Sequence, residues 1–473
     1  MCSMSLIAIN VSKHLGGFNV RNDTLSAAVS FNGGRATSVA SAHESPVTDL
    51  TDPHARSLTV AVLGMGYVGL PTALALAGAG HAVLGLDVSE QRLADIRDCR
   101  VDLVPADLVR LRQAIAQPTF LLSADTTLLS AADVVIVCVP TPIDTYLMPD
   151  LSPLAAACRT VVGRARPGQT IVLTSTTYVG TTRDLLVKPL SERGLDVGTD
   201  VHVAFSPERI DPGNTKHTQA SVPRVVGGVT QRCARRAGAL LAGIAANIHV
   251  VSSAEAAEMT KLVENTFRAV NIALANEFAE VGRVLGLEVM EVIHAAATKP
   301  YGFTPFFPGP GVGGHCIPCD PHYLLWQLRR DRVRTPVVEQ AMAAIAQRPL
   351  RVVDRVREVL SDNGLPLRGA RVLVVGVTYK PGVEDVRESP AIEILSRLRD
   401  AGCEADFWDE LAPALRLNDG SILKSLSDPV APDYDLILVH TLHPGTSYDR
   451  IAECPTVLDA TYRLTNVDHR MVV

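Results

Sequence analysis

A glycine turn between two short apolar segments is the feature that most limits what this chain can fold into. Residues 58–63 read as a buried strand, residues 64–69 have the sequence GMGYVG, and a helix-forming segment and a second apolar strand follow. In a βαβ unit of this kind, Gly64 permits a tight turn, Gly66 lets a diphosphate approach the backbone, and Gly69 lets the helix pack on the strand. The helix N-terminus offers N–H donors and partial positive charge to phosphates. The segment therefore predicts a dinucleotide-binding domain.

Asp87 indicates which dinucleotide that domain takes. It ends the second strand, HAVLGLDV, about 20 residues past the glycines. A carboxylate there accepts hydrogen bonds from an adenosine ribose and repels a 2′-phosphate, so NAD is favoured over NADP. A GxGxxG motif alone is weak evidence, but strand, glycines, helix, strand and terminal acid in this order are specific.

Further strands of the buried type follow along the chain. The strand ADVVIVCVP ends at Pro140 and Thr141, TIVLTST ends at Thr176, and VHVAFSPERIDPGN passes through Glu208. Because ligands bind at the carboxyl ends of strands in open parallel sheets, Thr176 and Glu208 are candidate site residues. Each could equally be a turn or cap residue.

The last third of the chain restarts the α/β pattern. Its strands are ARVLVVGVTYK, CEADFWD, YDLILVHT and TVLDAT, and Ser389 and Pro390 begin a helix as N-cap and N1 residue. This predicts a second nucleotide-binding-like sheet that lacks a GxGxxG motif. Lys380 and Arg387 flank its first turn and are either phosphate ligands or ordinary basic surface residues.

A long helix is expected from about Ser252, which forms a capping box with Glu255. Helical periodicity then continues for about nine turns. Lys261 and Asn265 are four residues apart and Arg268 follows, so we expect these side chains to share one face. The alternative is an ordinary solvated face. A helix of this length often links domains or forms a dimer interface.

The segment 301–323, YGFTPFFPGPGVGGHCIPCDPHY, is a Gly/Pro-rich loop around Cys316. The two glycines before the thiol let the chain turn sharply and bring backbone N–H groups near whatever the sulfur attacks. Alternatively Cys316 merely fills space, and Asp320 is the N-cap of a following helix with Pro321 at N1. The CxxC spacing to Cys319 also permits a redox pair or zinc site, but no second ligand cluster accompanies it.

Length, charge and composition limit which classes of protein this chain can belong to. A length of 473 residues suggests about three domains, and a net charge of −6 argues against nonspecific nucleic-acid binding. No apolar run is long enough to span a bilayer, so we expect no membrane partner. Nine scattered cysteines suggest a reducing compartment, hence a cytoplasmic protein. Residues 1–57 are rich in Ser, Ala, Asn and Gly and read as a disordered tail or an upstream start; a transit peptide is the alternative.

Taken together, these motifs resemble the UDP-glucose/GDP-mannose dehydrogenase family of nucleotide-sugar 6-dehydrogenases over residues 58–470. The resemblance rests on GMGYVGLP, VPTP, STTYVGTT, SPER, KLVENTFRAVNIALANE, GPGVGGHCIPCDP and TYKPGVEDVRESP. The Cys loop and SPERIDPGN look most like the branch that oxidises UDP-N-acetylglucosamine or its C4 epimer, with UDP-glucose as a further alternative. A non-catalytic NAD sensor would lack the nucleophile or its neighbours, which are present here.

The resemblance implies an α/β fold of two Rossmann-like doubly wound domains joined by a long central helix that also makes a dimer contact. The expected divisions are the N-terminal extension 1–57, the NAD-binding domain 58–251, the central helical domain 252–348 and the UDP-sugar-binding domain 349–473. A homodimer or higher homo-oligomer is expected. The implied reaction is a four-electron oxidation that uses two NAD and passes through a thiohemiacetal and a thioester on Cys316.

Site residues are carried over at the matching positions, and no metal is implied. The catalytic set is Cys316 as nucleophile, with Lys261, Asn265, Asp320, Glu208 and Thr176. The cofactor-binding set is Gly64, Gly66, Tyr67, Val68, Gly69, Asp87, Arg92, Pro140, Thr141, Thr176 and Arg387. The substrate-binding set is Glu208, Lys261, Asn265, Phe307, Gly309, Gly313 and Lys380.

Three positions depart from the pattern of the family. Val179 stands where the branch usually has Pro, and Thr174 stands where Glu is common. Pro212 occupies the place of a second acid found in other branches, with Asp211 beside it. The acid–base role is therefore assigned to Glu208 and none to Asp211.

Overall fold

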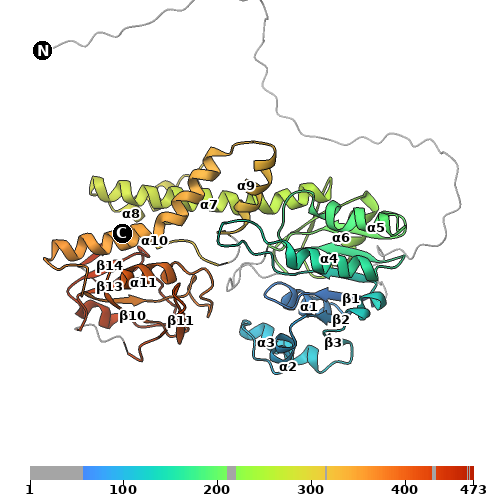
Figure 1. The fold of residues 1–473 in the computed structure, drawn as a ribbon, viewed down its shortest axis with the longest axis horizontal. Helices are drawn as coiled ribbons and strands as arrows, with labels where there is room; N and C mark the ends of the chain where they lie inside the picture. The colour runs from blue at the N-terminus through green and yellow to red at the C-terminus, as the bar shows by residue number, and fades with distance from the viewer. Residues whose placement is uncertain (1–56, 210–219, 315–316, 429–432, 466, 468) are drawn as a thin grey trace, which may run out of the picture. The chain divides into compact units, whose positions relative to one another are not determined.

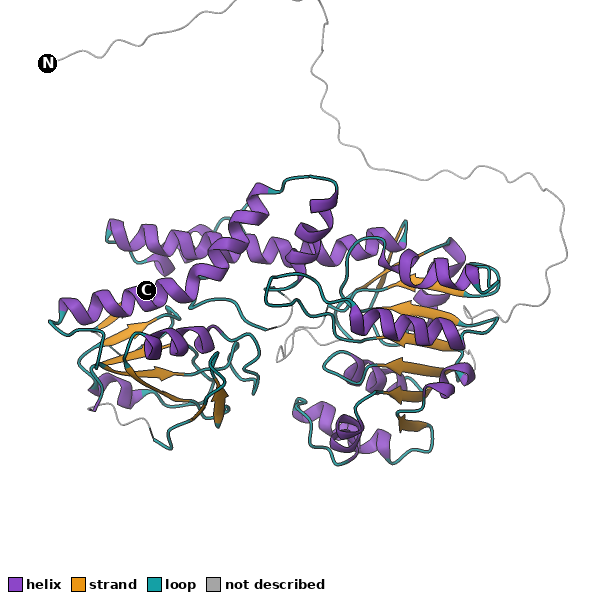
Figure 2. Ribbon diagram, in the orientation of Figure 1, coloured by secondary structure: helices purple, strands orange, loops and turns teal. Residues whose placement is uncertain are grey.

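The computed structural model describes residues 57–209, 220–314, 317–428, 433–465, 467 and 469–473. The expectations for the N-terminal extension to residue 56, for Asp211 and Pro212, and for Cys316 lie outside the described residues. Within them the fold is α/β, with helices against two separate sheets (Figures 1 and 2). The predicted fold class is confirmed.

The first sheet has eight strands in the order β3-β2-β1-β4-β5-β6-β7-β8. Its first six positions follow the strand order of a dinucleotide-binding Rossmann fold, with the switch point between β1 and β4. The strands are β1 Thr59–Leu63, β2 Ala82–Leu86, β3 Phe120–Ser123, β4 Val134–Val137, β5 Thr170–Leu173, β6 His202–Phe205, β7 Arg224–Gly228 and β8 Ile248–Val251. The predicted strands are therefore present, and β3, β7 and β8 are additional to them.

Helices cover both faces of this sheet, because successive residues of a buried strand point to opposite sides. In β1, Val60 and Val62 join one hydrophobic core, whereas Ala61 and Leu63 join the other. The covering helices are α1 Gly69–Gly78, α2 Glu90–Arg97, α3 Pro105–Ile115, α4 Ser152–Arg164, α5 Lys188–Glu192 and α6 Gln231–Leu241, with the short helices η1 Thr126–Ala131 and η2 Arg183–Val187.

Strand β7 reverses the direction of the sheet. It pairs antiparallel with β6, Ala204 opposite Gly228 and Phe205 opposite Gly227, and β8 then runs parallel to β7. Because of this reversal, the first residue of β7 lies at the edge where β1, β4, β5 and β6 end. Arg224, the first residue of β7, therefore lies at the carboxyl edge of the sheet, where ligands bind in sheets of this kind.

Four helices form the central region: α7 Ala254–Leu285, α8 Val289–Ala297, α9 Asp320–Arg330 and α10 Pro336–Asp362. The long helix α7 has 32 residues and ends on Gly286 in the left-handed conformation, φ 67°. Its N-cap is Ser253, whose hydroxyl accepts from the Ala256 N–H, so the expected capping box from Ser252 is wrong by one residue. Helix α7 packs along both α9 and α10.

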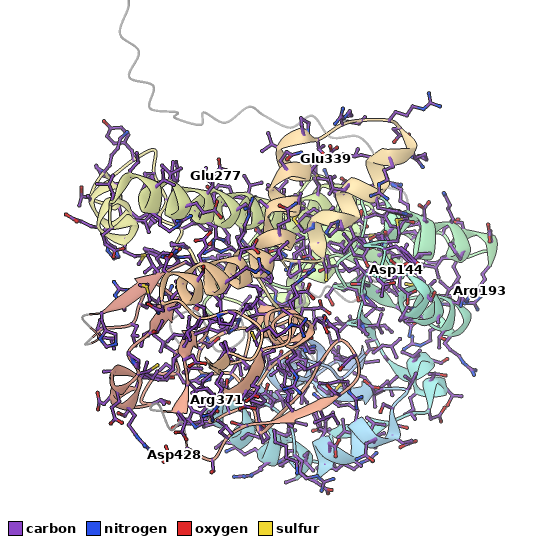
Figure 3. All side chains as sticks on the ribbon, turned by 60° about the vertical axis from the view of Figure 1, so that its left-hand side comes forward. Asp144, Arg193, Glu277, Glu339, Arg371 and Asp428 are labelled. Atoms are coloured by element: carbon purple, nitrogen blue, oxygen red, sulfur yellow. The ribbon has the colours of Figure 1, made fainter. Side chains whose placement is uncertain are left out.

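The second sheet has five parallel strands in the order β10-β9-β13-β14-β15, the other common order of doubly wound sheets. Its elements are β9 Arg371–Val375, α11 Pro390–Asp400, β10 Glu404–Trp408, β13 Leu436–Val439, η4 Asp449–Glu453, β14 Val457–Asp459 and β15 Arg470–Val472, with a hairpin of β11 Ala414–Arg416 and β12 Ile422–Lys424. The predicted Ser389 N-cap is confirmed by its bond from the Ala391 N–H. Arg371, which Figure 3 labels, is the first residue of β9.

Helix α10 crosses the expected division between residues 348 and 349. It continues through Pro349 to Asp362, where its C-terminal half joins the core of the second sheet through Val352, Val356 and Leu360. The domain divisions given above remain predictions. In the part of the chain that the structure describes, no helix is long and apolar enough to cross a membrane.

Two glycines of α1 provide a test of its packing. A Cβ at Gly69 would lie 1.8 Å from the carbonyl oxygen of Gly64, whereas a Cβ at Gly78 would meet no described atom within 4 Å. We expect Gly69→Ala to lower the free energy of unfolding by about 3 kcal/mol, the upper end of the cost of overpacking. Gly78→Ala should leave it unchanged or raise it by less than about 1 kcal/mol. Urea unfolding of both variants measures the difference, and equal stabilities would contradict the assigned helix–strand approach.

Candidate functional site

The glycine turn between β1 and α1 has the shape that a dinucleotide needs. Gly64 has φ +95°, and a Cβ there would lie 2.6 Å from the Cys138 carbonyl oxygen. Gly66 is open, with no described atom within 4 Å of the position of a Cβ. Helix α1 begins at Gly69, and its N-cap residue Val68 makes no side-chain hydrogen bond to the first turn. The Leu70 N–H of the first turn donates to the Gly66 carbonyl at 3.1 Å and Pro71 has no N–H, so a diphosphate would meet the open backbone at Gly66 and the positive end of the helix dipole.

Asp87 is held rigidly at the carboxyl end of β2. Its carboxylate accepts from the Met65 N–H at 2.8 Å and from the Ser89 N–H at 2.9 Å. Arg92, from α2, donates through Nε to the Met65 carbonyl at 2.9 Å. The side chains of the predicted residues Asp87 and Arg92 thus both bond to the main chain of Met65 in the glycine turn. A carboxylate fixed here fits the ribose hydroxyls of NAD.

Arg387 reaches the glycine turn from the segment that follows β9. Its guanidinium lies 4.0 Å from the centroid of the Tyr67 ring, and it makes paired hydrogen bonds to Asp385. These bonds raise the pKa of Arg387 above its usual value. The Arg387 carbonyl also accepts from the Gly314 N–H, within the Cys loop, at 3.1 Å. A cation held over this turn fits the charge of a diphosphate.

Lys261 and Asn265 are buried, and each bonds to another predicted site residue. The Lys261 ammonium donates to the main-chain oxygen of Glu208 at 2.8 Å, and the Asn265 amide donates to the Asp320 carboxylate. The exposed fractions of Lys261, Asn265, Glu208 and Asp320 are 8%, 4%, 9% and 3%. The solvated-face alternative is therefore wrong for this pair of helix residues. Arg268 lies on the same face of the helix by its spacing, but it is exposed, so the burial does not extend to it.

Asp320 is the first residue of α9 and not its N-cap. The N-cap is Cys319, which makes no side-chain bond to the helix. The Asp320 carboxylate turns to Asn265 instead, so a contact between helices outweighs the local capping preference. Cys319 itself is buried.

The side chain of Glu208 has a partner that the sequence did not reveal. Its Oε2 accepts from Arg224 Nη2 at 2.8 Å, and its Oε1 accepts from the Arg209 N–H at 2.8 Å. Arg224 is the first residue of β7 and is 3% exposed. The only sequence signal was an arginine directly before the short apolar run VVGG.

Thr176 is half-buried in the segment that follows β5. Two side chains that sequence reasoning missed hold the next residues of this segment. Gln327 of α9 accepts from the Val179 N–H at 3.0 Å and donates to the Val179 carbonyl at 2.7 Å. Glu258 of α7 accepts from the N–H groups of Gly180 and Thr182, while burial raises the pKa of its carboxyl. The structure thus ties this segment to α7 and α9.

Tyr323 of α9 makes a corresponding bond to the segment after β4. Its hydroxyl donates to the carbonyl of Thr141, which directly follows Pro140, at 3.1 Å. The hydroxyl of Tyr323 is fully buried. The turns after β4 and β5, which carry predicted cofactor residues, are therefore both fastened to the helix that follows the Cys loop.

The predicted substrate residues of the loop before Cys316 contact the central helices and the second sheet. The Gly309 N–H donates to Asn276 at 3.0 Å, and its carbonyl accepts from Arg348 at 2.8 Å. A Cβ at Gly313 would lie 2.6 Å from both the Glu388 carbonyl oxygen and the Tyr379 Cβ, so this glycine fits against the turn that carries Lys380.

Phe307 borders a cavity of about 400 Å³ between α8 and the segment after β14. His294 lies 5.6 Å from the Phe307 ring centroid, and the Arg463 guanidinium lies 5.9 Å from it. Tyr462 and Arg470 also line this cavity. None of these four residues was predicted.

The described residues contain no group of three or more His, Cys, Asp or Glu side chains that could hold a metal ion. The buried polar groups collected around Lys261 instead offer hydrogen-bond donors and carboxylates. Such groups can stabilise an oxyanion, transfer a proton and orient water.

Comparison with known proteins agrees with this geometry. Three models of the UDP-glucose/GDP-mannose dehydrogenase family match in succession: the NAD binding domain over residues 58–245, the central domain over 255–344 and the UDP binding domain over 373–467. The matched NAD binding domain contains the glycine turn and Asp87, and the prediction of NAD is confirmed.

Relatives match along most of their length. The chain is 36% identical to the UDP-N-acetyl-D-mannosamine dehydrogenase of Methanocaldococcus jannaschii, over 75% of this chain and 79% of that protein. It is 32% identical to the UDP-N-acetyl-D-glucosamine 6-dehydrogenase of Pseudomonas aeruginosa, over 82% and 91%. The solved structure of the UDP-D-ManNAc dehydrogenase from Pyrococcus horikoshii superposes with a TM-score of 0.80 at 30% identity, covering 88% of this chain and 98% of that one.

This chain, which all three family models match, combines a glycine turn that fits NAD, a buried Lys–Asn–Asp group and a second nucleotide-binding-like sheet. The protein therefore belongs to the UDP-glucose/GDP-mannose dehydrogenase family and is an NAD-dependent UDP-sugar dehydrogenase.

Proposed function

We propose that the chain oxidises C6 of a UDP-N-acetylhexosamine, UDP-N-acetylglucosamine first, to the uronic acid in a four-electron reaction. One observation carries the proposal: α7 buries Lys261 and Asn265 one turn apart, with Lys261 on Glu208 and Asn265 on Asp320. These groups come from the carboxyl edge of the NAD sheet and from the helix that begins four residues after Cys316. A primary alcohol bound among them would meet a cation, an amide and a carboxylate.

The residues of the chain would divide the chemistry as follows. NAD, when bound, accepts one hydride from C6 in each of the two oxidations. Asp320 takes up the proton of the C6 hydroxyl, and Lys261 and Asn265 stabilise the oxyanion that develops. The Cys316 thiolate adds to the aldehyde to give a thiohemiacetal, and the second oxidation leaves a thioester.

Hydrolysis completes the proposed reaction. Water held by Thr176 and Glu208 adds to the thioester carbonyl, the C–S bond breaks, and the Cys316 sulfur leaves with one proton. The uronic acid that remains ionises. Covalent capture by Cys316 would keep the aldehyde from escaping between the two oxidations.

The choice of sugar rests on the relatives. Those with N-acetylhexosamine names include glucosamine, mannosamine and galactosaminuronic acid dehydrogenases. The glucosamine enzyme of Pseudomonas aeruginosa matches over 82% of this chain and 91% of its own length, more than the mannosamine enzyme of Methanocaldococcus jannaschii with 75% and 79%. The second candidate is UDP-N-acetylmannosamine, which the higher identity of 36% favours.

Incubation with NAD and each of four UDP-sugars tests the substrate. We expect UDP-N-acetylglucosamine to yield two NADH per sugar, with a kcat/KM about 10- to 100-fold above that of UDP-glucose, since losing the contacts of one small group typically costs about 1–3 kcal/mol. A preference for the N-acetylmannosamine or N-acetylgalactosamine sugar would move the assignment to an epimer. A preference for UDP-glucose would contradict the N-acetylhexosamine proposal.

The covalent scheme is tested by Cys316→Ser, with Cys319→Ser as the matched control in the same loop. We expect Cys316→Ser to slow acid formation by about 10³-fold or more while its affinity for NAD stays unchanged, because a serine hydroxyl is far less nucleophilic at neutral pH. Cys319→Ser should retain turnover within a few-fold. Wild-type turnover of Cys316→Ser would rule out covalent catalysis by this residue.

We further propose that the chain forms a homodimer through α7. An apolar stripe runs along the exposed side of this helix at spacings of three, four and seven residues, and consists of Val263, Phe267, Leu274, Phe278, Val281 and Leu285. Large apolar side chains repeated along one helix face are usually covered by a partner. A second copy of α7 would supply an identical stripe, and such self-complementary faces are typical of two-fold dimers.

The double variant Phe267→Glu/Phe278→Glu tests this dimer. These rings are 52% and 53% exposed, so the change should leave the fold intact, and we expect the apparent mass in light scattering to fall by half. Ile422→Glu, an equally exposed position in the β11–β12 hairpin, serves as control and should not change the mass. A wild-type monomer, or a dimer that survives both glutamates, would contradict the assignment.

A further inference from the structure

The reversal of β7 brings a cation to the carboxyl edge of the NAD sheet. In the β6–β7 pair, Phe205 lies opposite Gly227, and extending this antiparallel register by three residues places Glu208 opposite Arg224. Directly opposed side chains of an antiparallel pair are close enough to interact. The two side chains indeed form an ion pair, with 2.8 Å between Arg224 Nη2 and Glu208 Oε2.

We propose that Arg224 is a positioning residue for the hydrolytic half of the reaction: it holds the Glu208 carboxylate oriented toward the water that attacks the thioester. The inference rests on the proposed function, because it assigns Arg224 a role only through Glu208. Arg224 itself touches neither the sugar nor the coenzyme in this scheme.

The ion pair between Arg224 and Glu208 is important to the site because both side chains are buried. The side chains of Arg224 and Glu208 are 4% and 10% exposed. A carboxylate removed from water is stable only when charge-assisted hydrogen bonds compensate for lost hydration, and an arginine supplies the strongest such bonds. Without Arg224 the buried Glu208 carboxylate would lose this hydrogen-bond partner and turn toward solvent, where it would orient water poorly.

The main chain around Glu208 is fixed independently of Arg224. Lys261 bonds to the Glu208 carbonyl, and the next residue, Arg209, pairs with Glu264 of α7 at 2.7 Å. Removing the Arg224 side chain should therefore release the carboxylate while the backbone stays in place. This separation is what makes a selective effect on hydrolysis measurable.

Arg224 also retains a donor for a polar molecule. Its Nη1 is buried and makes no hydrogen bond to the described residues. A buried guanidinium N–H without a protein partner is normally satisfied by an ordered water. A water bonded to Nη1 would lie beside the Glu208 carboxylate, where the hydrolytic water is needed.

Rapid mixing with UDP-N-acetylglucosamine and NAD tests the proposal on Arg224→Met. We expect a burst of two NADH per active site at a rate within about 3-fold of wild type, followed by steady-state turnover slowed by about 10²-fold. Intact-protein mass spectrometry of the quenched reaction should show the sugar thioester on the variant and little on wild type. Arg236→Met is the matched control, because Arg236 bonds to Thr170 and Gly168 at the opposite end of β5.

Combination with Glu208→Gln shows whether Arg224 acts through Glu208. If it does, Arg224→Met should slow hydrolysis by less than about 3-fold in the Glu208→Gln background, since residues that act as a unit are strongly non-additive. Independent, multiplicative effects would overturn the proposal. So would an Arg224→Met variant that hydrolyses its thioester as fast as Arg236→Met.

Arg224→Lys keeps the test decisive if the Met variant does not fold. Lysine preserves the charge but not the planar fork, so we expect hydrolysis about 10-fold slower than wild type with an unchanged burst. Wild-type hydrolysis, or equal slowing of burst and hydrolysis, would overturn the inference. Failure of the proposed function is distinguishable, because wild type would then give no burst of two NADH per active site with any of the four UDP-sugars.

Discussion

The hydrogen bond from the Lys261 ammonium to the Glu208 carbonyl is the contact on which the candidate site most depends. A buried ammonium is costly unless it is bonded, so this contact fixes the position of α7 along the edge of the NAD sheet. Once that register is set, the i+4 residue Asn265 must face the start of α9, where it meets Asp320. One helix face thereby joins the carboxyl edge of a sheet to the helix that follows the Cys loop.

Features that depend on local chemistry could be predicted from the sequence. The turn at Gly64 and Gly69 was predictable because Gly64 has a positive φ and a Cβ at Gly69 would lie 1.8 Å from the Gly64 carbonyl oxygen, so both requirements arise within the turn itself. The N-cap at Ser389 followed from a hydroxyl placed directly before a proline. The α/β class with two sheets followed from repeated buried strands, and the length of α7 from its helical period.

Features that arise from contacts distant in sequence could not be predicted in this way. Lysine and asparagine on a helix are usually solvated, and only the packing of α7 against the sheet buries Lys261 and Asn265. Asp320 carries every local sign of an N-cap, yet its bond to Asn265 lies 55 residues away in the chain. Arg224 becomes visible only when β7 is known to run antiparallel, and strand direction has no local signature.

A contact distant in sequence also accounts for the departure at Val179. The side-chain amide of Gln327, 148 positions away in sequence, bonds to both the N–H and the carbonyl of Val179. A proline at 179 has no N–H, so the bond that Gln327 accepts would be lost. The Val179 carbonyl bond would survive such a change. With the Tyr323 hydroxyl on the Thr141 carbonyl, α9 is thus fastened to the two turns after β4 and β5 through main-chain atoms. Bonds to main-chain groups tolerate substitution of the bonded residue, which allows those turns to vary in side chain while α9, and with it Asp320, stays in place.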